Sequence, residues 1–400
     1  QVAGQGLTPL YRFFVPSRGF HFYTASLAER DNIIARLSAA YTYEGVGYHV
    51  LAGNWRVEKL PHTGVTGCYR VDPSFWGVCD RAGVIELNPQ QDGHRAAINP
   101  MRYENLPSMF GPYSYTSCVR DSVTGLVWEG KTVAGSRAGS HSYTHLGNNE
   151  TTDVSGHVAA VNASALCGFS DWRLPTRQEL LNLVNFAGGL GPNLNATYFP
   201  NTPADAVYWA SEADRLDTTR AWYVPFGNYP GISDSNERTF ARHLRLVRGD
   251  PPSASAHRFT FSTVAYGSDA ANNLVNDAWT GLQWRRCEEG RTWSGTSCLG
   301  SGSDFSHANA LAHARDQMGW RLPNVKELAS LTDLSVVNLT GTALDLLAFP
   351  GAHGSSIWTS TGYLSLAETR AWTVNFYGGS IQSTGRAAAS ARVRLVRFHP

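Results

Sequence analysis

The sequence predicts two tandem domains, each of mixed α and β structure with long loops and an aromatic core. Three observations predict this fold class. One motif occurs twice, at residues 171–180 and 320–328, and each occurrence reads as the end of a strand, a Pro and the start of a helix. The chain holds 12 Trp and 39 Gly but only 16% charged residues, which is typical of a loop-rich fold rather than a helical one. Its six Cys fall into three pairs of sequence neighbours.

Each copy of the motif starts a helix with a capping box. Thr176 stands three residues before Glu179, and Asn324 stands three residues before Glu327. At this spacing the short polar side chain accepts a hydrogen bond from the helix, and the carboxylate reaches back to the amide of the cap. The apolar residues that follow are expected to face the core, namely Leu180, Leu181 and Val184 in the first copy and Leu328, Leu331 and Leu334 in the second.

The repeat extends far beyond this motif. Trp172 and Trp320 are expected to anchor the capped helix to a sheet. Five landmarks recur in the same order, at residues 124–128 and 280–284, 171–180 and 320–328, 208–211 and 357–360, 220–226 and 370–376, and 244–248 and 393–397. A period of roughly 150 residues indicates duplication of a whole domain rather than a solenoid.

Three domains are expected along the chain. Residues 1–58 form an aromatic repeat unit, 59–250 the first large domain and 251–400 the second, with the Pro and Ser-rich residues 251–256 at the boundary. Residues 59–112 show little periodicity, so we expect them to wrap on the first large domain as irregular structure. The two large domains are expected to lie side by side, because the connector is short.

The N-terminal unit shows its own pattern of strands and one helix. The predicted strands are residues 10–14, 21–24 and 43–48, and the predicted helix is residues 26–37. Ser26 with Glu29 three positions later gives this helix a capping box.

The cysteines indicate disulfides rather than a metal site. The simplest of 15 possible pairings joins sequence neighbours, giving Cys68 with Cys79, Cys118 with Cys167, and Cys287 with Cys298. No C-x-x-C occurs and no His stands at zinc-finger spacing, so no metal is predicted. Three disulfides predict an oxidising compartment.

Composition excludes several functions. A net charge of +1 argues against nucleic acid as a partner, since duplex binding depends on a basic excess. No apolar run reaches the length of a membrane span, so none is predicted. The chain begins at Gln1, as expected of a secreted protein after removal of its leader.

Several segments resemble known families. Residues 167–180, 208–211, 221–224 and 244–248, with their counterparts in the second copy, resemble the DUF1566 family, the C-terminal domain of the Legionella collagen-like adhesin. Residues 7–52 resemble the DUF5648 repeat of secreted bacterial proteins.

The resemblance implies a fold, a location and a class of ligand. The implied fold is α+β and C-type-lectin-like, in two tandem domains with small twisted antiparallel sheets, long loops and disulfides. The implied location is extracellular, at the bacterial cell surface. Relatives of the adhesin type bind sulfated glycosaminoglycans, and the fold is shared in outline with formylglycine-generating enzymes.

Searches for catalytic and metal-binding patterns are negative. The sequence contains no H-E-x-x-H, G-x-S-x-G, phosphate-binding loop or dinucleotide fingerprint. His307 and His313 stand six residues apart, which does not place them on one helix face, so they are interpreted as surface or capped histidines. Oxygen-bearing residues at 214–217 and 234–237 could bind Ca²⁺, but they are typical of solvated turns, and no cofactor is predicted.

The candidate ligand-binding residues lie between the last Trp strand and the final Arg strand of each copy. These segments are punctuated by Gly, mix Tyr, Asn, Ser and Arg, and differ between the copies while their flanks agree. The candidates are Tyr223, Asn228, Tyr229, Arg238, Arg242 and His243 in the first copy, and Asn375, Tyr377, Gln382, Arg386 and Arg392 in the second.

The leading interpretation is a secreted, lectin-like bacterial adhesin that binds a glycan or another surface macromolecule without catalysis. Two sites on one chain would gain avidity on a repetitive polymer. One alternative is a structural subunit that self-assembles into an extracellular filament. Another is an enzyme of the formylglycine-generating-like fold with an unrecognised site.

Overall fold

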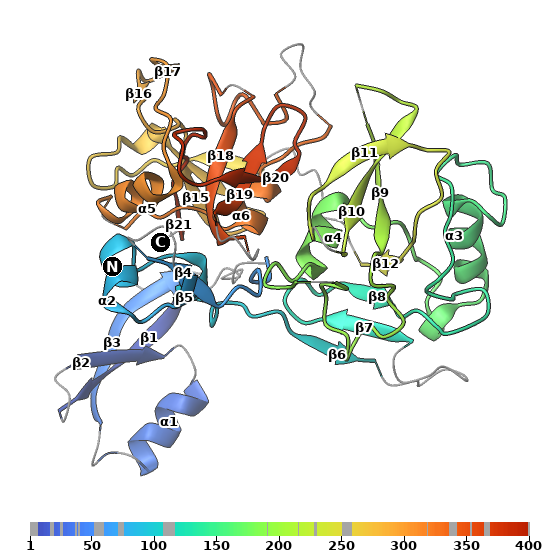
Figure 1. The fold of residues 1–400 in the computed structure, drawn as a ribbon. Helices are drawn as coiled ribbons and strands as arrows, with labels where there is room; N and C mark the ends of the chain where they lie inside the picture. The colour runs from blue at the N-terminus through green and yellow to red at the C-terminus, as the bar shows by residue number, and fades with distance from the viewer. Residues whose placement is uncertain are drawn as a thin grey trace. The chain divides into compact units, whose positions relative to one another are not determined.

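The computed structural model describes residues 7–16, 20–24, 27–36, 38, 41–51, 60–70, 76–106, 117–189, 191–214, 216–227, 230–249, 258–317, 319–335, 342–352, 354–363 and 369–398. The chain divides into two compact units, Gln1–Val57 and Glu58–Pro400. Short helices and small antiparallel sheets occur in both units (Figure 1), so the predicted α+β class is confirmed. In the described ranges, no helix has the length and apolar character needed to cross a bilayer.

The first unit is a three-stranded antiparallel sheet with one helix. Its elements are β1 (Leu7–Val15), β2 (Phe20–Thr24), α1 (Leu27–Arg36) and β3 (Thr42–Leu51), and the strand order is β2-β1-β3. Tyr11 and Phe13 stand two residues apart, on one face of β1, and form a small core with Ile33 of α1. The predicted strands and helix are confirmed, while the predicted cap Ser26 lies outside the described residues.

The two copies in the second unit share one topology. The first copy contains β7 (Cys118–Asp121), β8 (Val127–Glu129), α3 (Val154–Ala163), η2 (Leu166–Gly168), α4 (Arg177–Leu183), β9 (Val207–Ala213), β10 (Arg220–Pro225), β11 (Asp234–Glu237) and β12 (Val247–Arg248). The second contains β13 (Phe259–Phe261), η3 (Ala271–Asn273), β14 (Leu274–Asp277), β15 (Leu282–Arg285), β16 (Thr292–Trp293), β17 (Cys298–Leu299), α5 (His307–Arg315), α6 (Val325–Ser330), β18 (Ser356–Gly362), β19 (Arg370–Asn375), β20 (Ile381–Gly385) and β21 (Val396–Phe398).

Strand order confirms the duplication. In each copy the last strand returns beside the strand of the Thr-Gly-Leu-x-Trp landmark, giving the four-stranded orders β12-β8-β7-β6, where β6 is Tyr103–Asn105, and β13-β14-β15-β21. A separate three-stranded sheet follows the capped helix, with the orders β11-β10-β9 and β18-β19-β20.

Both capped helices form as predicted. Thr176 and Asn324 accept hydrogen bonds from the amides of Glu179 and Glu327, whose carboxylates in turn accept from the amides of the caps. The six apolar residues predicted to face the core are all buried. Local sequence was sufficient here, because both partners of each cap lie within one turn.

The predicted role of the two Trp is wrong in one respect. Trp172 is buried with Val154 and Val161 of α3, and Trp320 with residues of α5, whereas the apolar residues of α4 and α6 belong to another cluster. The reason is visible at Asn162 of α3. Its side chain accepts from the amide of Trp172 at 2.8 Å and donates to the carbonyl of Trp172 at 2.9 Å, which fixes this Trp beside α3.

The two copies share a hydrophobic core. One cluster of buried side chains draws on both copies, and Phe186 of the first packs edge-on against Trp372 of the second at 5.2 Å between ring centroids. The Nζ atom of Lys326 donates to the carbonyl of Asn182 at 2.9 Å and to that of His62 at 3.0 Å. The expected contact between the copies is therefore present.

Residues 60–106 differ from the prediction. They contain β4 (Gly67–Tyr69), β5 (Trp76–Val78), α2 (Ala82–Leu87), η1 (Asp92–Arg95) and β6 (Tyr103–Asn105). Although β6 joins the sheet of the first copy, Tyr69 donates to the carbonyl of Arg370 at 2.6 Å and Asn88 donates to that of Leu311 at 2.7 Å. This segment therefore packs on both copies, because buried carbonyls of the second copy take their donors from it.

All three predicted disulfides are confirmed, joining Cys68 to Cys79, Cys118 to Cys167, and Cys287 to Cys298. The second of these links β7 to η2, beside α3.

Candidate functional site

The first copy brings two predicted residues together. Tyr223 lies on β10, and Arg242 follows β11 in a segment that pairs with Tyr143 through two backbone hydrogen bonds of 2.8 and 3.0 Å. This pairing places the Arg242 guanidinium over the ring of Tyr223, 4.4 Å from its centroid, and 5.6 Å from that of Trp209. Such stacking fixes the cation without neutralising it.

No carboxylate in the described part of the chain pairs with the charge of Arg242. In the described part of the chain, burial and the Tyr223 hydroxyl are the influences on its pKa, and no carboxylate takes part. Burial lowers the pKa of the guanidinium, which stays charged at neutral pH. Its buried Nε–H has no hydrogen-bond partner among the described residues. The side chain is half-buried, so this cation is held in place and open to solvent on one side.

Arg238 precedes Arg242 by four residues and forms two hydrogen bonds with His145. Its Nε donates to the carbonyl of His145 at 2.5 Å, and the amide of His145 donates to the carbonyl of Arg238 at 2.8 Å. The imidazole Nε2 lies 3.1 Å from the carbonyl of Ala210, which can only accept, so Nε2 carries the proton. Burial lowers the pKa of His145, and its Nδ1 is a buried acceptor without a partner in the described ranges.

The remaining first-copy candidates do not join this group. His243 packs on Tyr208 at 5.8 Å between ring centroids, and its Nδ1 lies 3.1 Å from the carbonyl of His141. Asn228 and Tyr229 lie outside the described residues.

In the second copy, three candidates lie on the hairpin between β19 and β20. Tyr377 is 60% exposed, and its amide donates to the Asn375 side chain at 2.7 Å. Gln382 is exposed and donates to Ser380 at 3.0 Å. These residues form a solvent-facing turn, as expected.

Two other second-copy candidates are not on the open surface. Arg386 is only 4% exposed, and its Nε donates to Nδ1 of His307 at 3.2 Å while Tyr69 stacks on its guanidinium at 3.4 Å. The prediction of a surface position for Arg386 is therefore wrong, because Tyr69 covers it. Arg392 pairs with the buried Glu288 at 2.9 Å.

His307 also differs from the prediction. It is fully buried, with Nε2 2.9 Å from the carbonyl of Thr359, and not a surface residue. Burial, followed by the nearby charge of Arg386, lowers its pKa to about 3. His313, by contrast, is partly exposed and lies 2.7 Å from Glu289.

Comparison with known families agrees with this duplicated geometry. The Lcl C-terminal domain family matches residues 117–248 and 273–397, more than half of the chain. The chain belongs to the Lcl C-terminal domain family. A domain of unknown function, DUF5648, matches residues 1–65. No curated protein matches the chain.

The two Lcl C-terminal copies share a histidine, and the equivalence of its two occurrences was not predicted from the sequence. His145 and His307 both contact the carbonyl after the Trp of the second sheet, Ala210 and Thr359 respectively. Both rings lie edge-on to that Trp, at 5.6 and 5.1 Å. The signal was present as Tyr-Thr-His at residues 143–145 and Phe-Ser-His at 305–307, but an insertion before α3 hides the correspondence.

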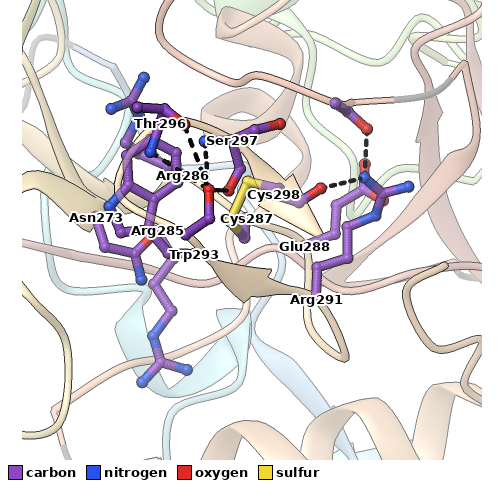
Figure 2. Close-up of a disulfide and its surroundings, with 12 residues drawn as sticks. Asn273, Arg285, Arg286, Cys287, Glu288, Arg291, Trp293, Thr296, Ser297 and Cys298 are labelled. Carbon is purple, nitrogen blue, oxygen red and sulfur yellow. Dashed lines mark hydrogen bonds between the residues drawn. A yellow bond between two sulfur atoms is a disulfide. The ribbon is translucent and has the colours of Figure 1, made fainter. Parts of the chain in front are cut away.

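The second Lcl C-terminal copy also contains a polar cavity that the sequence did not indicate. It includes Cys287 of the Cys287–Cys298 disulfide and has a volume of about 170 Å³. Figure 2 shows Asn273, Arg285, Glu288 and Arg291 near this disulfide. The lining residues of the cavity are Ser268, Asp269, Asn273, Arg285, Cys287, Glu288, Glu289, Arg291 and Gln317. They come from separate loops and strands, so no local motif reveals them.

One cluster in residues 60–106 has the residue types of a metal site. Cys68, Cys79 and His94 place one potential ligand atom each within 4.8 Å of one another. The two sulfurs form a disulfide, however, and metal binding by Cys requires the thiolate. The oxygens considered for Ca²⁺ are engaged locally, since Asp214 accepts from Ser235 and Asp217 from Thr219.

Proposed function

We propose that this chain is a secreted, non-catalytic adhesin of the bacterial surface whose first Lcl C-terminal copy binds an acidic glycan. The scaffold in this proposal is C-type-lectin-like, and the binding face contains Tyr223, Arg238 and Arg242. Membership of a family associated with surface proteins and three disulfides support the location.

The observation that carries this proposal is the unpaired guanidinium of Arg242. Arginines are rarely fully buried without a partner for their charge, and Arg242 is half-buried. Arg242 stacks on two aromatic rings and has a buried Nε–H without a partner among the described residues.

A sulfate or carboxylate group satisfies this guanidinium well. Arginine offers parallel N–H donors whose spacing matches the oxygens of such groups, and charge-assisted bonds of this kind are roughly twice as strong as neutral ones. Arg238 adds a second positive charge on the same face. Binding by surface charges is weakened by salt, so repeated engagement along a polymer supplies part of the affinity.

The test is a glycan array that pairs sulfated or uronic-acid-containing polysaccharides with their desulfated or reduced forms. The intact chain is expected to bind the acidic member of a pair, and Arg242→Ala to reduce that binding about tenfold, on the scale of one charge-assisted bond. Arg120→Ala is the matched control. It removes the same charge from an exposed arginine whose nearest carboxylate, Glu104, lies at 3.4 Å.

Two results would contradict the proposal. One is equal binding to the acidic and neutral members of each pair. The other is an equal loss of binding in Arg242→Ala and Arg120→Ala, which would show that net charge rather than this site is responsible.

A further inference from the structure

The cavity beside the Cys287–Cys298 disulfide contains buried polar atoms without partners. Asn273 Oδ1, Glu288 Oε1 and Arg291 Nε are all buried and have no hydrogen-bond partner among the described residues. Glu288 as a whole is only 2% exposed. Figure 2 shows these residues around the disulfide. Leaving such atoms unpaired costs about 1–3 kcal/mol each, so the cavity is suited to hold a polar molecule.

Glu288 is the clearest example of a buried polar atom without a partner among the described residues. Its Oε2 accepts from Arg392 at 2.9 Å, whereas its Oε1 lies 3.6 Å from the nearest guanidinium nitrogen of Arg394, too far for a hydrogen bond. One oxygen of this buried carboxylate therefore lacks a hydrogen-bond partner among the described residues.

The rest of the wall is held in place. Arg285 donates to Asp269 at 2.9 Å, to Glu289 at 3.1 Å and to Gln317 at 3.1 Å. Arg291 donates from Nη1 to the carbonyl of Gly351 at 2.7 Å, and its Nε has no hydrogen-bond partner among the described residues. A wall fixed by such contacts needs little reorganisation on binding.

Charge and size indicate the class of ligand. Three carboxylates and two guanidiniums line the cavity, and Arg392 and Arg394 approach Glu288 at 2.9 and 3.6 Å. A wall that offers donors and acceptors together suits hydroxyl groups, which both donate and accept. Since liquid water occupies about 30 Å³ per molecule, 170 Å³ has room for about five waters or one sugar ring.

We propose that this cavity of the second copy binds one neutral sugar residue, as a free monosaccharide or as the terminal unit of a glycan. Ser268 is exposed, so the cavity reaches solvent at this residue and a sugar can enter. This site is separate from the acidic-glycan face of the first copy and differs from it in charge.

The equivalent position in the first copy carries a residue of opposite charge. Glu129 stands where Arg285 stands in the second, and their backbone amides donate to the carbonyls of Leu246 and Leu395, each next to the last strand of its copy. The Glu129 carboxylate is fully buried, with Lys131 at 2.9 Å and His157 at 3.6 Å. Burial opposes its ionisation, but Lys131 and His157 outweigh burial and lower its pKa to about 2. Only the second copy is therefore expected to bind the sugar.

Saturation-transfer NMR on the full chain tests this proposal. The probes are the methyl glycosides of glucose, galactose, mannose and N-acetylglucosamine, with methyl glucuronide as the charged comparison. At least one neutral probe is expected to bind, and Asn273→Leu, which removes an acceptor at nearly constant volume, is expected to weaken it about tenfold. Ser268→Trp, a change at an exposed position that leaves the core intact, is expected to block the entrance.

Arg242→Ala separates this site from the acidic-glycan face, since it is expected to bind the neutral probe as the unsubstituted chain does. The proposal is overturned if no neutral probe binds, if the glucuronide binds more tightly than every neutral probe, or if Ser268→Trp binds unchanged. If Asn273→Leu fails to fold, Ser268→Trp alone decides.

Discussion

One surface is exposed in the first Lcl C-terminal copy, and the equivalent surface is covered in the second. At the end of β9 in the first copy, Ser211 and Ala213 are exposed, whereas their counterparts at the end of β18, Ser360 and Gly362, are buried. The difference comes from residues 60–106. Tyr69 of this segment stacks on Arg386 and lies edge-on to His307 at 5.3 Å between ring centroids.

This difference explains why the copies diverge where they do. The second copy has Thr373 and Ala391 where the first has Tyr223 and Arg242, and both are buried. A face that packs against its own chain needs small, satisfied side chains, while an open face can carry an unpaired cation. The second copy thus uses as an internal contact the face that the first presents to solvent.

The largest expected difference between the copies is the loss of stability when the glutamate of the capping box is removed. Arg321 and Glu327 form a bidentate pair at 2.6 and 2.7 Å with side chains 2% and 1% exposed. In the first copy Glu179 is equally buried, but its partner Arg173 is 26% exposed. Glu327→Ala should destabilise the protein by about 3–5 kcal/mol, since it removes the carboxylate from a buried ion pair, and Glu179→Ala by roughly half as much.

The shift of the urea midpoint, followed by tryptophan fluorescence, measures both effects. Equal shifts for the two variants would show that exposure of the arginine does not set the cost of losing its partner.

The stability of the protein is expected to fall with pH because of His307 in the second copy. The unfolded chain protonates His307 below about 6.5, but the folded chain does so only near its lowered pKa of about 3. Stability is therefore lost as pH falls from 6.5 toward 3, and the loss between pH 7 and 5 should be about 2 kcal/mol from this residue.

Urea midpoints at the two pH values, compared between the unsubstituted chain and His307→Gln, isolate this contribution. His62 and His145 are present in both proteins, so their contributions cancel in the difference. An unchanged pH dependence in His307→Gln would contradict the assignment of a neutral, buried imidazole.

The smallest expected contrast concerns the tyrosines of the two variable segments. Tyr223→Ala should weaken acidic-glycan binding about fivefold, because it removes the ring that holds Arg242, whereas Tyr377→Ala should change it by less than about twofold. Titration of the glycan against each variant measures this. A greater loss in Tyr377→Ala would move the binding face to the β19–β20 hairpin of the second copy.

Features that depend on neighbouring residues could be predicted from the sequence. The capping boxes, the disulfide pairs and the repeated landmarks all follow from residues close in the chain or from one ordered pattern. The burial of Arg386 under Tyr69 could not be predicted, because the two residues are far apart in the sequence. The hydrogen bond that holds Tyr69 on the second copy likewise joins it to Arg370, 301 positions away. The cavity beside the Cys287–Cys298 disulfide was missed for the same reason, since side chains from several loops converge on it only after folding.

The contacts of Lys326 limit how this protein can evolve. Its amino group donates to the carbonyls of His62, in residues 60–106, and of Asn182, in the first copy. Phe186 of the first copy packs against Trp372 of the second at the same junction. Neither half can be lost, exchanged or transferred to another gene without uncovering that junction. The duplicated pair is therefore expected to be inherited as one piece, with new binding properties arising in its outer loops rather than by shuffling of single copies.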